Sequence, residues 1–250
     1  MTSAIGPFQV LGAQLYSTHH ASAEDLLAGR ERPFTPPAFR LLVGRARRFT
    51  SLVTQLHIEV CGALGGAAAA AFAVFATCHG EIQTAERLVA DFRDAQVVSS
   101  ARFALSVHNT ASGVYSVAIG SNAPTTTVTG GNAIAAGWLE AALTALDEER
   151  CVLLSIADEP VPAVLCGPTE PAGIAAAFLL APATAAPPPA GRRAQLAIEA
   201  CGACAEAAPR EALGQAVAAV GRAQPSRITL GRIHPGAVLE LQIAAEDAGR

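Results

Sequence analysis

Lysine is absent from this chain of 250 residues, and charge of either sign is scarce. All 17 cationic side chains are arginines, and charged residues make up 15% of the sequence. The net charge of −4 gives no basic surface of the kind that attracts nucleic acid or an anionic membrane, so neither partner is expected. Aromatic residues are few, at 5%, whereas the apolar content reaches 51% and is rich in alanine. Such a chain can bury a sizeable core and still offer apolar surface to a protein partner.

Long apolar runs and targeting signals are also missing. No stretch of about 18 apolar residues occurs, so no membrane span is expected. The first residues show neither a basic region nor an apolar core of a signal peptide, which predicts a cytoplasmic protein with its six cysteines as free thiols. Cys201 and Cys204 form a lone Cys-x-x-Cys pair without a second ligand pair, so neither a metal site nor a cofactor is predicted.

The order of the predicted elements indicates an α/β fold. Ala71–Thr77 is a strand-length apolar run, followed by a turn and the amphipathic segment Gln83–Phe92. Phe103–Val107 repeats this pattern as a short strand before a turn and the helix Val114–Gly120. The further predicted strands of this part are Phe8–Tyr16, Thr125–Thr129, Cys151–Ala157 and Ile174–Ala181.

The end of the sequence differs in composition. Pro182–Arg193 is rich in proline and alanine and is predicted to be a connector. Ala194–Gly221 is predicted to be mostly helical, with short strands at Ile228–Leu230 and Ala237–Ile243. The chain is therefore divided into a main domain, residues 1–182, and an α+β segment, residues 183–250, that packs on it.

Four segments together resemble a known family: Arg40–Arg48, Val74–Phe92, Phe103–Ala118 and Thr125–Leu146. In this order they are similar to the N-terminal β-ketoacyl-synthase-like proteins, stand-alone relatives of β-ketoacyl synthases and chain length factors of aryl-polyene and type II polyketide pathways. The resemblance covers residues 5–181 and is thin over 190–250. It implies a thiolase-like half-fold, with a mixed, mostly parallel five-stranded sheet and helices on both faces.

In active relatives a cysteine stands in a turn at the start of a buried helix, where the helix N-terminus lowers the thiol pKa. Matching on the glycine of this turn places Thr110 at the cysteine position, and matching on Ser106 and Val107 places Ala111 there. His234 matches neither of the family's two catalytic histidine loops. The resemblance therefore implies a former active site without catalysis. Its residues are His108, Asn109, Thr110, Ala111, Ser112 and Gly113.

The resemblance also implies partners. They are a full-length β-ketoacyl synthase, whose acyl-chain pocket this chain would help to shape, and an acyl carrier protein; a homodimer is expected in isolation. The strand before the turn is the implied interface, because an apolar sheet edge needs a partner. The interface residues would be Phe103, Ala104, Leu105, Ser106 and Val107, and carrier-binding residues would be Arg45, Arg47 and Arg48, unless these arginines form a solvated helix face.

Two other functions stay open at this point. A stand-alone acyl-thioesterase or acyltransferase would use Thr110 or Ser112 as nucleophile and His108 as base. A homodimeric scaffold would have no chemistry. Among the remaining polar residues, Glu81 is expected to support the start of the following helix, and Asp158 and Glu159 are expected to face solvent or the interface.

Overall fold

One mixed sheet runs through the part of the chain that the computed structural model describes, residues 3–38, 40–44, 47, 49–65, 72–167, 172–183, 191–201, 208–222 and 224–244. Within these residues the sheet has eight strands, in the order β3-β2-β4-β5-β1-β6-β8-β7. The strands are β1 (Ser3–Ser17), β2 (Phe72–Thr77), β3 (Thr125–Thr129), β4 (Val152–Asp158), β5 (Ile174–Pro182), β6 (Arg192–Ala200), β7 (Ser226–His234) and β8 (Ala237–Ile243). The helices are α1 (Ala23–Leu27), α3 (Leu52–Ala63), α4 (Ile82–Ala95), α5 (Ser100–Phe103), α6 (Thr110–Ile119), α7 (Ala133–Asp147), α8 (Ala163–Cys166) and α9 (Pro209–Val220).

The first five strands confirm the expected α/β class and the mixed sheet. β2 pairs in parallel with β3 and β4, whereas β5 is antiparallel to both of its neighbours, β4 and β1. Four of these strands therefore run in one direction and β5 runs in the other. Every residue of β5 is buried, because its continuous apolar sequence is covered on both faces of the sheet.

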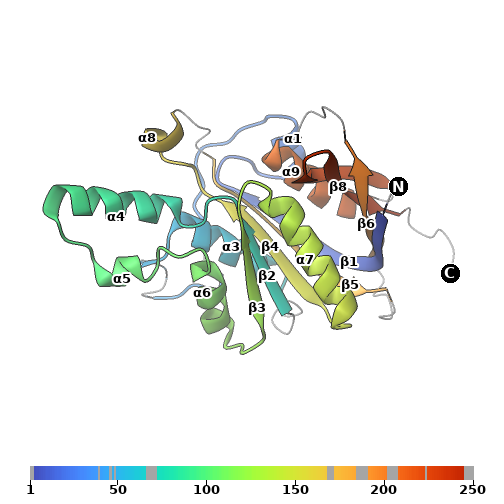
Figure 1. Cartoon of the computed structure of the whole chain (residues 1–250), viewed down its shortest axis with the longest axis horizontal. Helices are drawn as coiled ribbons and strands as arrows, with labels where there is room; N and C mark the ends of the chain where they lie inside the picture. Colours follow the sequence, from blue (N-terminus) through green and yellow to red (C-terminus); the bar gives the residue numbers. More distant parts are fainter. Residues whose placement is uncertain are drawn as a thin grey trace.

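Helices cover both faces, as expected. Alternate residues of β2 enter two different cores: Val74 and Ala76 join the cluster that contains α7, and Ala73 and Phe75 join the cluster that contains α3. This alternation is the two-residue period of a strand. Figure 1 shows α7 in front of the strands and α3 behind them.

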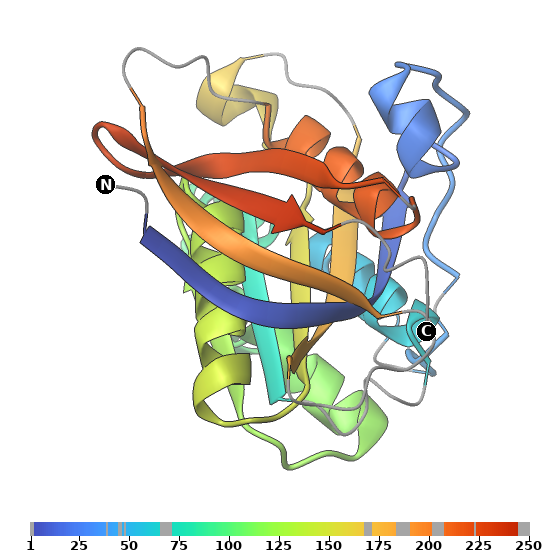
Figure 2. The same ribbon diagram turned by 90° about the vertical axis from the view of Figure 1, so that its right-hand side faces the viewer.

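The sheet is larger than the five strands expected, because three strands follow along the edge of β1. β6 pairs antiparallel with β1 and β8, and β8 pairs antiparallel with β7 (Figure 2). The prediction of a mostly helical 194–221 is wrong for β6. Its alanines favour a helix, but buried Ala194 and Leu196 alternate with exposed Arg193 and half-buried Gln195, the pattern of a strand. The boundary at residue 182 stays a prediction.

The predicted strand Phe103–Val107 is not a strand. Phe103 ends the short helix α5, and the following residues form a turn. The amide of Phe103 donates to the carbonyl of Ser99 at 2.8 Å, and the amide of Ser106 donates to the carbonyl of Phe103 at 3.1 Å. These local hydrogen bonds occupy the backbone groups that a strand would have offered to a neighbouring strand.

Free thiols were expected at all six cysteines, and the structure shows them at four and a disulfide at one. Cys61, Cys78, Cys151 and Cys166 are free thiols. Cys201 is disulfide-bonded, and Cys204 lies outside the described residues. The expectation came from the predicted compartment, which says nothing about which cysteines lie close together.

Candidate functional site

The segment 108–113, predicted as a former active-site turn, is a turn only at His108 and Asn109, because Thr110 already begins α6 and the predicted helix start at Val114 is wrong. Thr110 is the first residue of this helix and is buried, as are Ala111 and Ser112. His108 and Asn109 precede the helix and are exposed. A helix N-terminus of the kind that activates a thiol is thus present, and both residues proposed for the cysteine position, Thr110 and Ala111, lie in its first turn.

The hydroxyl groups of the turn are not bonded to a base. Thr110 Oγ1 is buried and has no hydrogen-bond partner among the described residues. Ser112 Oγ donates to the carbonyl of Asn109 at 2.9 Å and accepts from Thr127 Oγ1 at 3.3 Å. Both contacts fix the serine as a structural group, so the turn does not form a nucleophile–base pair with His108.

We expect that Thr110→Val leaves the free energy of unfolding unchanged or raises it by up to about 1 kcal/mol. Valine keeps the shape of the side chain and removes a buried hydroxyl that has no partner. Urea unfolding followed by circular dichroism measures the change. A loss above about 1 kcal/mol would show that the hydroxyl does make a stabilising bond.

The loop after β2 is held by a carboxylate from β4, which lies beside β2 in the sheet. Asp158, at the end of β4, accepts through Oδ1 from Thr77 Oγ1 at 2.9 Å and from the amide of Cys78 at 2.8 Å. Gly80 has a positive φ of 60°, and a Cβ there would lie 3.4 Å from the Cα of His108. The loop is therefore packed closely against the α6 turn, so both belong to one site.

Glu159, the next residue, joins two helices. It is 4% exposed, and its two carboxylate oxygens accept from two backbone amides: Val53 at 3.2 Å, in the first turn of α3, and Gln83 at 2.9 Å, in the first turn of α4. A carboxylate at a helix N-terminus satisfies amides that have no partner within the helix. Glu159 therefore ties the starts of α3 and α4 to the end of β4.

Glu81 lies beside this connection and is also 4% exposed. Its carboxylate accepts from Thr54 Oγ1 at 2.6 Å and from Thr84 Oγ1 at 3.2 Å, again linking α3 to α4. We call Glu81, Glu159 and these four donor residues the carboxylate clamp. Glu81 stands at the N-cap of α4, but its carboxylate accepts from the Thr84 hydroxyl and not from a backbone amide of that helix. The expectation that Glu159 faces solvent or the interface is wrong.

Burial controls the ionisation of the clamp. It raises the pKa of Glu159 to about 7, helped by the negative charge of Glu81 and opposed by the two amide hydrogen bonds. Burial likewise raises the pKa of Glu81, and the hydroxyl donors oppose it. Asp158 is shifted in the same direction by burial, against the hydrogen bonds from the loop.

A cavity of about 650 Å³ opens beside these strand ends. Its lining includes Cys78, His79 and Asp158 together with the apolar side chains of Ile134 and Leu213. Burial and the charge of Asp158 raise the pKa of the Cys78 thiol to about 12, so it stays protonated and is a poor nucleophile near neutral pH. Among the described residues, no group of three potential metal ligands is found.

Residues 23–228 match the family model described as the β-ketoacyl synthase, N-terminal domain. The chain belongs to this family. The match extends into the segment where the resemblance was expected to be thin. No curated protein sequence matches the chain.

Solved structures of ketosynthases share the fold. The complex of the ketosynthase ApeO with its chain length factor ApeC from Xenorhabdus doucetiae matches with a TM-score of 0.71 at 16% identity, over 95% of this chain and 99% of that chain. The ishigamide ketosynthase/chain length factor matches at 0.57 and 16%, over 79% of this chain and 67% of that chain. A β-ketoacyl synthase from Burkholderia phymatum STM815 matches at 0.58 and 13%, over 88% and 70%. The chain therefore has the thiolase-like ketosynthase fold.

The assignment of Thr110 or Ala111 to the cysteine position of active relatives stays a prediction for this member of the β-ketoacyl synthase family. Of the three arginines predicted to bind a carrier protein, Arg47 is exposed, whereas Arg45 and Arg48 lie outside the described residues. Their role stays a prediction. No helix of the described residues is long and apolar enough to span a membrane.

Proposed function

We propose that this chain is a non-catalytic, chain-length-factor-like subunit that pairs with an active β-ketoacyl synthase. It would help to shape the pocket for the growing acyl chain in a polyene, polyketide or fatty-acid type of biosynthesis, with an acyl carrier protein as donor. The observation that carries this proposal is the α6 turn: its helix N-terminus is kept, while the hydroxyl of Thr110 is buried without a base. A kept fold with an inactive turn suits a subunit that works through an interface.

The stand-alone thioesterase or acyltransferase receives no support from the geometry. Such an enzyme needs a nucleophile within hydrogen-bond reach of its base. Thr110 Oγ1 has no partner among the described residues, and Ser112 Oγ is bonded to Asn109 and Thr127. Neither hydroxyl is prepared for attack on a thioester.

The open edge of the sheet suggests where the partner binds. β3 pairs with β2 on one side, and no other described strand covers its outer side. The carbonyl of Pro124 accepts from Ala73 of β2, so the alternate residues Thr125, Thr127 and Thr129 direct their backbone groups outward. This row of unpaired groups is a template for a strand of another chain. The interface strand is thus proposed at β3.

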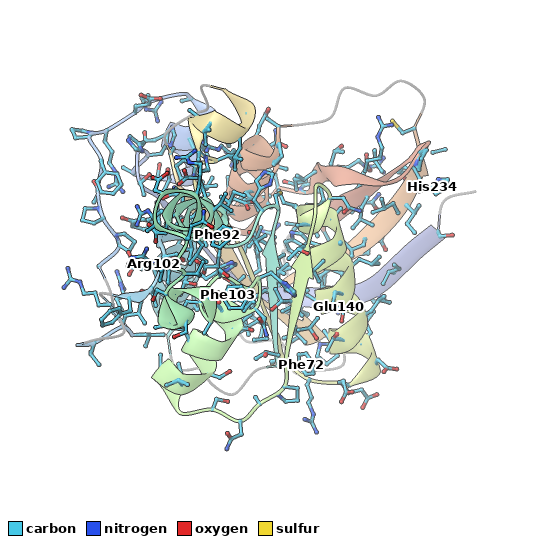
Figure 3. The ribbon with its side chains drawn as sticks, turned by 60° about the vertical axis from the view of Figure 1, so that its left-hand side comes forward. Phe72, Phe92, Arg102, Phe103, Glu140 and His234 are labelled. Carbon is cyan, nitrogen blue, oxygen red and sulfur yellow. The ribbon has the colours of Figure 1, made fainter. Side chains whose placement is uncertain are left out.

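Residues of the segment Phe103–Val107, which the sequence assigned to an interface strand, are also proposed to contact the partner, although they form a turn and not a strand. Phe103 is 62% exposed and Val107 is 44% exposed, on the turn between α5 and α6. They would contact the partner as side chains rather than as a paired strand. Figure 3 labels Phe103 on the side of the molecule that carries β3, away from His234.

Co-expression with a full-length β-ketoacyl synthase from the same gene neighbourhood tests the proposal. We expect a stable 1:1 complex in size-exclusion chromatography with light scattering, and chain elongation only when both subunits are present. An isolated chain that stays monomeric or forms only self-dimers beside the synthase would contradict the proposed pairing.

A matched pair of variants tests whether the outer edge of β3 binds the partner. Thr129→Pro removes one outward amide donor from β3, and proline is tolerated on an edge strand. Thr129→Ser keeps that amide and serves as the control. We expect the proline variant to weaken the complex while the serine variant leaves it unchanged.

A further inference from the structure

Helices α4 and α5 form an arm that stands out from the body of the molecule (Figure 1). Of the 14 residues of α4, Leu88 alone is buried, and α5 has no buried residue. A helix packed on its own chain would bury a full apolar face. The arm therefore leaves most of its surface uncovered by the described residues.

The surface that the arm offers is apolar. Val89 and Phe92 on α4 are 69% and 52% exposed, and they are three residues apart, so they share one face of the helix. Val97 and Val98 follow in the connection, and Phe103 ends α5 with 62% of its surface exposed. Figure 3 shows Phe92 and Phe103 on neighbouring parts of the arm. Clustered apolar side chains of this kind mark interaction surfaces.

The charges of the arm are balanced within the arm. Arg102 pairs with Asp91 at 2.5 Å, and Arg93 pairs with Asp94 at 2.9 Å. The remaining charged residues between 82 and 103 are Glu86 and Arg87, so the arm has no net charge. A neutral apolar surface does not favour an acidic carrier protein or an anionic membrane, both of which select for basic residues. It suits an apolar protein surface.

The root of the arm is fixed. The carboxylate clamp binds the first turn of α4 through the Gln83 amide and the Thr84 hydroxyl, and binds α3 on its other side. An arm held at its root loses little conformational freedom when it binds, which favours association.

We propose that the α4–α5 arm docks on the partner β-ketoacyl synthase next to the strand pairing at β3; this inference rests on the proposed function. The arm and the open edge of β3 lie on the same side of the molecule (Figures 1 and 3), so one partner can cover both. Edge pairing by a five-residue strand buries too little area for a stable dimer, and the arm supplies apolar area beside it. Phe92 and Phe103 are the anchors, since large aromatic side chains dominate interface energetics.

The double variant Phe92→Ser/Phe103→Ser tests the arm. Both side chains are exposed, so the variant should fold with an unchanged circular dichroism spectrum and melting temperature. We expect its affinity for the co-purified β-ketoacyl synthase to fall at least tenfold, measured by biolayer interferometry. The control is Phe34→Ser, a phenylalanine with a similar exposure of 56% on the segment after α1, which should leave the affinity unchanged.

The outcomes separate the two proposals. If the wild-type chain forms no complex with the synthase, the proposed function is wrong, and the synthase is excluded as the binding partner of the arm. If the complex forms and the double variant binds as tightly as the wild type, or Phe34→Ser weakens it equally, the docking arm alone is wrong. The docking proposal is also wrong if the double variant keeps its affinity for the synthase but no longer binds phosphatidylcholine–phosphatidylglycerol vesicles, which would point to a membrane. It is equally wrong if the double variant keeps that affinity but no longer self-associates, which would point to a second copy of the chain.

Discussion

Relative to the variant Glu159→Gln, the wild type is expected to lose about 3 kcal/mol of its free energy of unfolding when the pH is raised from 4 to 9. Burial raises the pKa of Glu159 to about 7 in the folded chain, above the ordinary glutamate value of 4.5. The folded state therefore holds the proton more tightly than the unfolded state. The stabilisation is complete below about pH 4.5 and is lost as the pH rises through 7.

The comparison with the variant is needed because another buried group acts in the opposite direction. Burial lowers the pKa of His57 to about 3, so this group destabilises the fold as the pH falls below its ordinary range near 6.5. Both chains share His57, and its effect cancels in the difference. Urea unfolding at several pH values measures that difference, and the exposed Glu148→Gln is the control for removal of one charge. A difference that stays constant with pH would show that Glu159 is not buried as described.

Trp138→Ala is expected to lower the free energy of unfolding by about 4 kcal/mol. Trp138 is fully buried on α7 and packs against Phe178 of β5, with ring centroids 4.6 Å apart. Removing the indole leaves a large cavity between this helix and the centre of the sheet. The loss is a large fraction of the whole stability of an ordinary domain, which is about 5–15 kcal/mol. Far-ultraviolet circular dichroism is the suitable probe, because Trp138 is the single tryptophan and its fluorescence disappears in the variant.

Trp138→Phe is the matched control for that variant. The indole nitrogen is buried and has no hydrogen-bond partner among the described residues, so phenylalanine keeps an aromatic ring and removes an unsatisfied donor. Its cost should be less than half that of alanine. An alanine variant that loses under about 1 kcal/mol would show that α7 does not pack on β5 in this way.

The sequence predicts the central strands well because their patterns are determined by burial on two faces. β5 is an unbroken apolar run and β4 is apolar except for Ser155 and Asp158, and apolar runs of strand length belong to the middle of a sheet. Phe103–Val107 has a similar composition but no place in the sheet. Its backbone bonds to Ser99 and Arg102, and an apolar composition alone does not distinguish a strand from an exposed apolar turn.

One part of the candidate site can be predicted from the sequence and another part cannot. The α6 turn can be singled out from the sequence, because its residues are contiguous and resemble a family motif. The carboxylate clamp cannot, because Glu159 finds its donors on α3 and α4, far away in the sequence. One signal was available: an acidic pair directly after a buried strand marks the end of a sheet where sites of α/β proteins gather.

The position of β1 has a consequence for synthesis of the chain. Phe8 of β1 pairs with Pro182 on one side and with Ala194 on the other, so this strand is made long before both of its neighbours. Contacts between distant residues slow folding, and an apolar strand that waits for its neighbours is exposed to aggregation. Chaperones should therefore raise the yield of the folded chain.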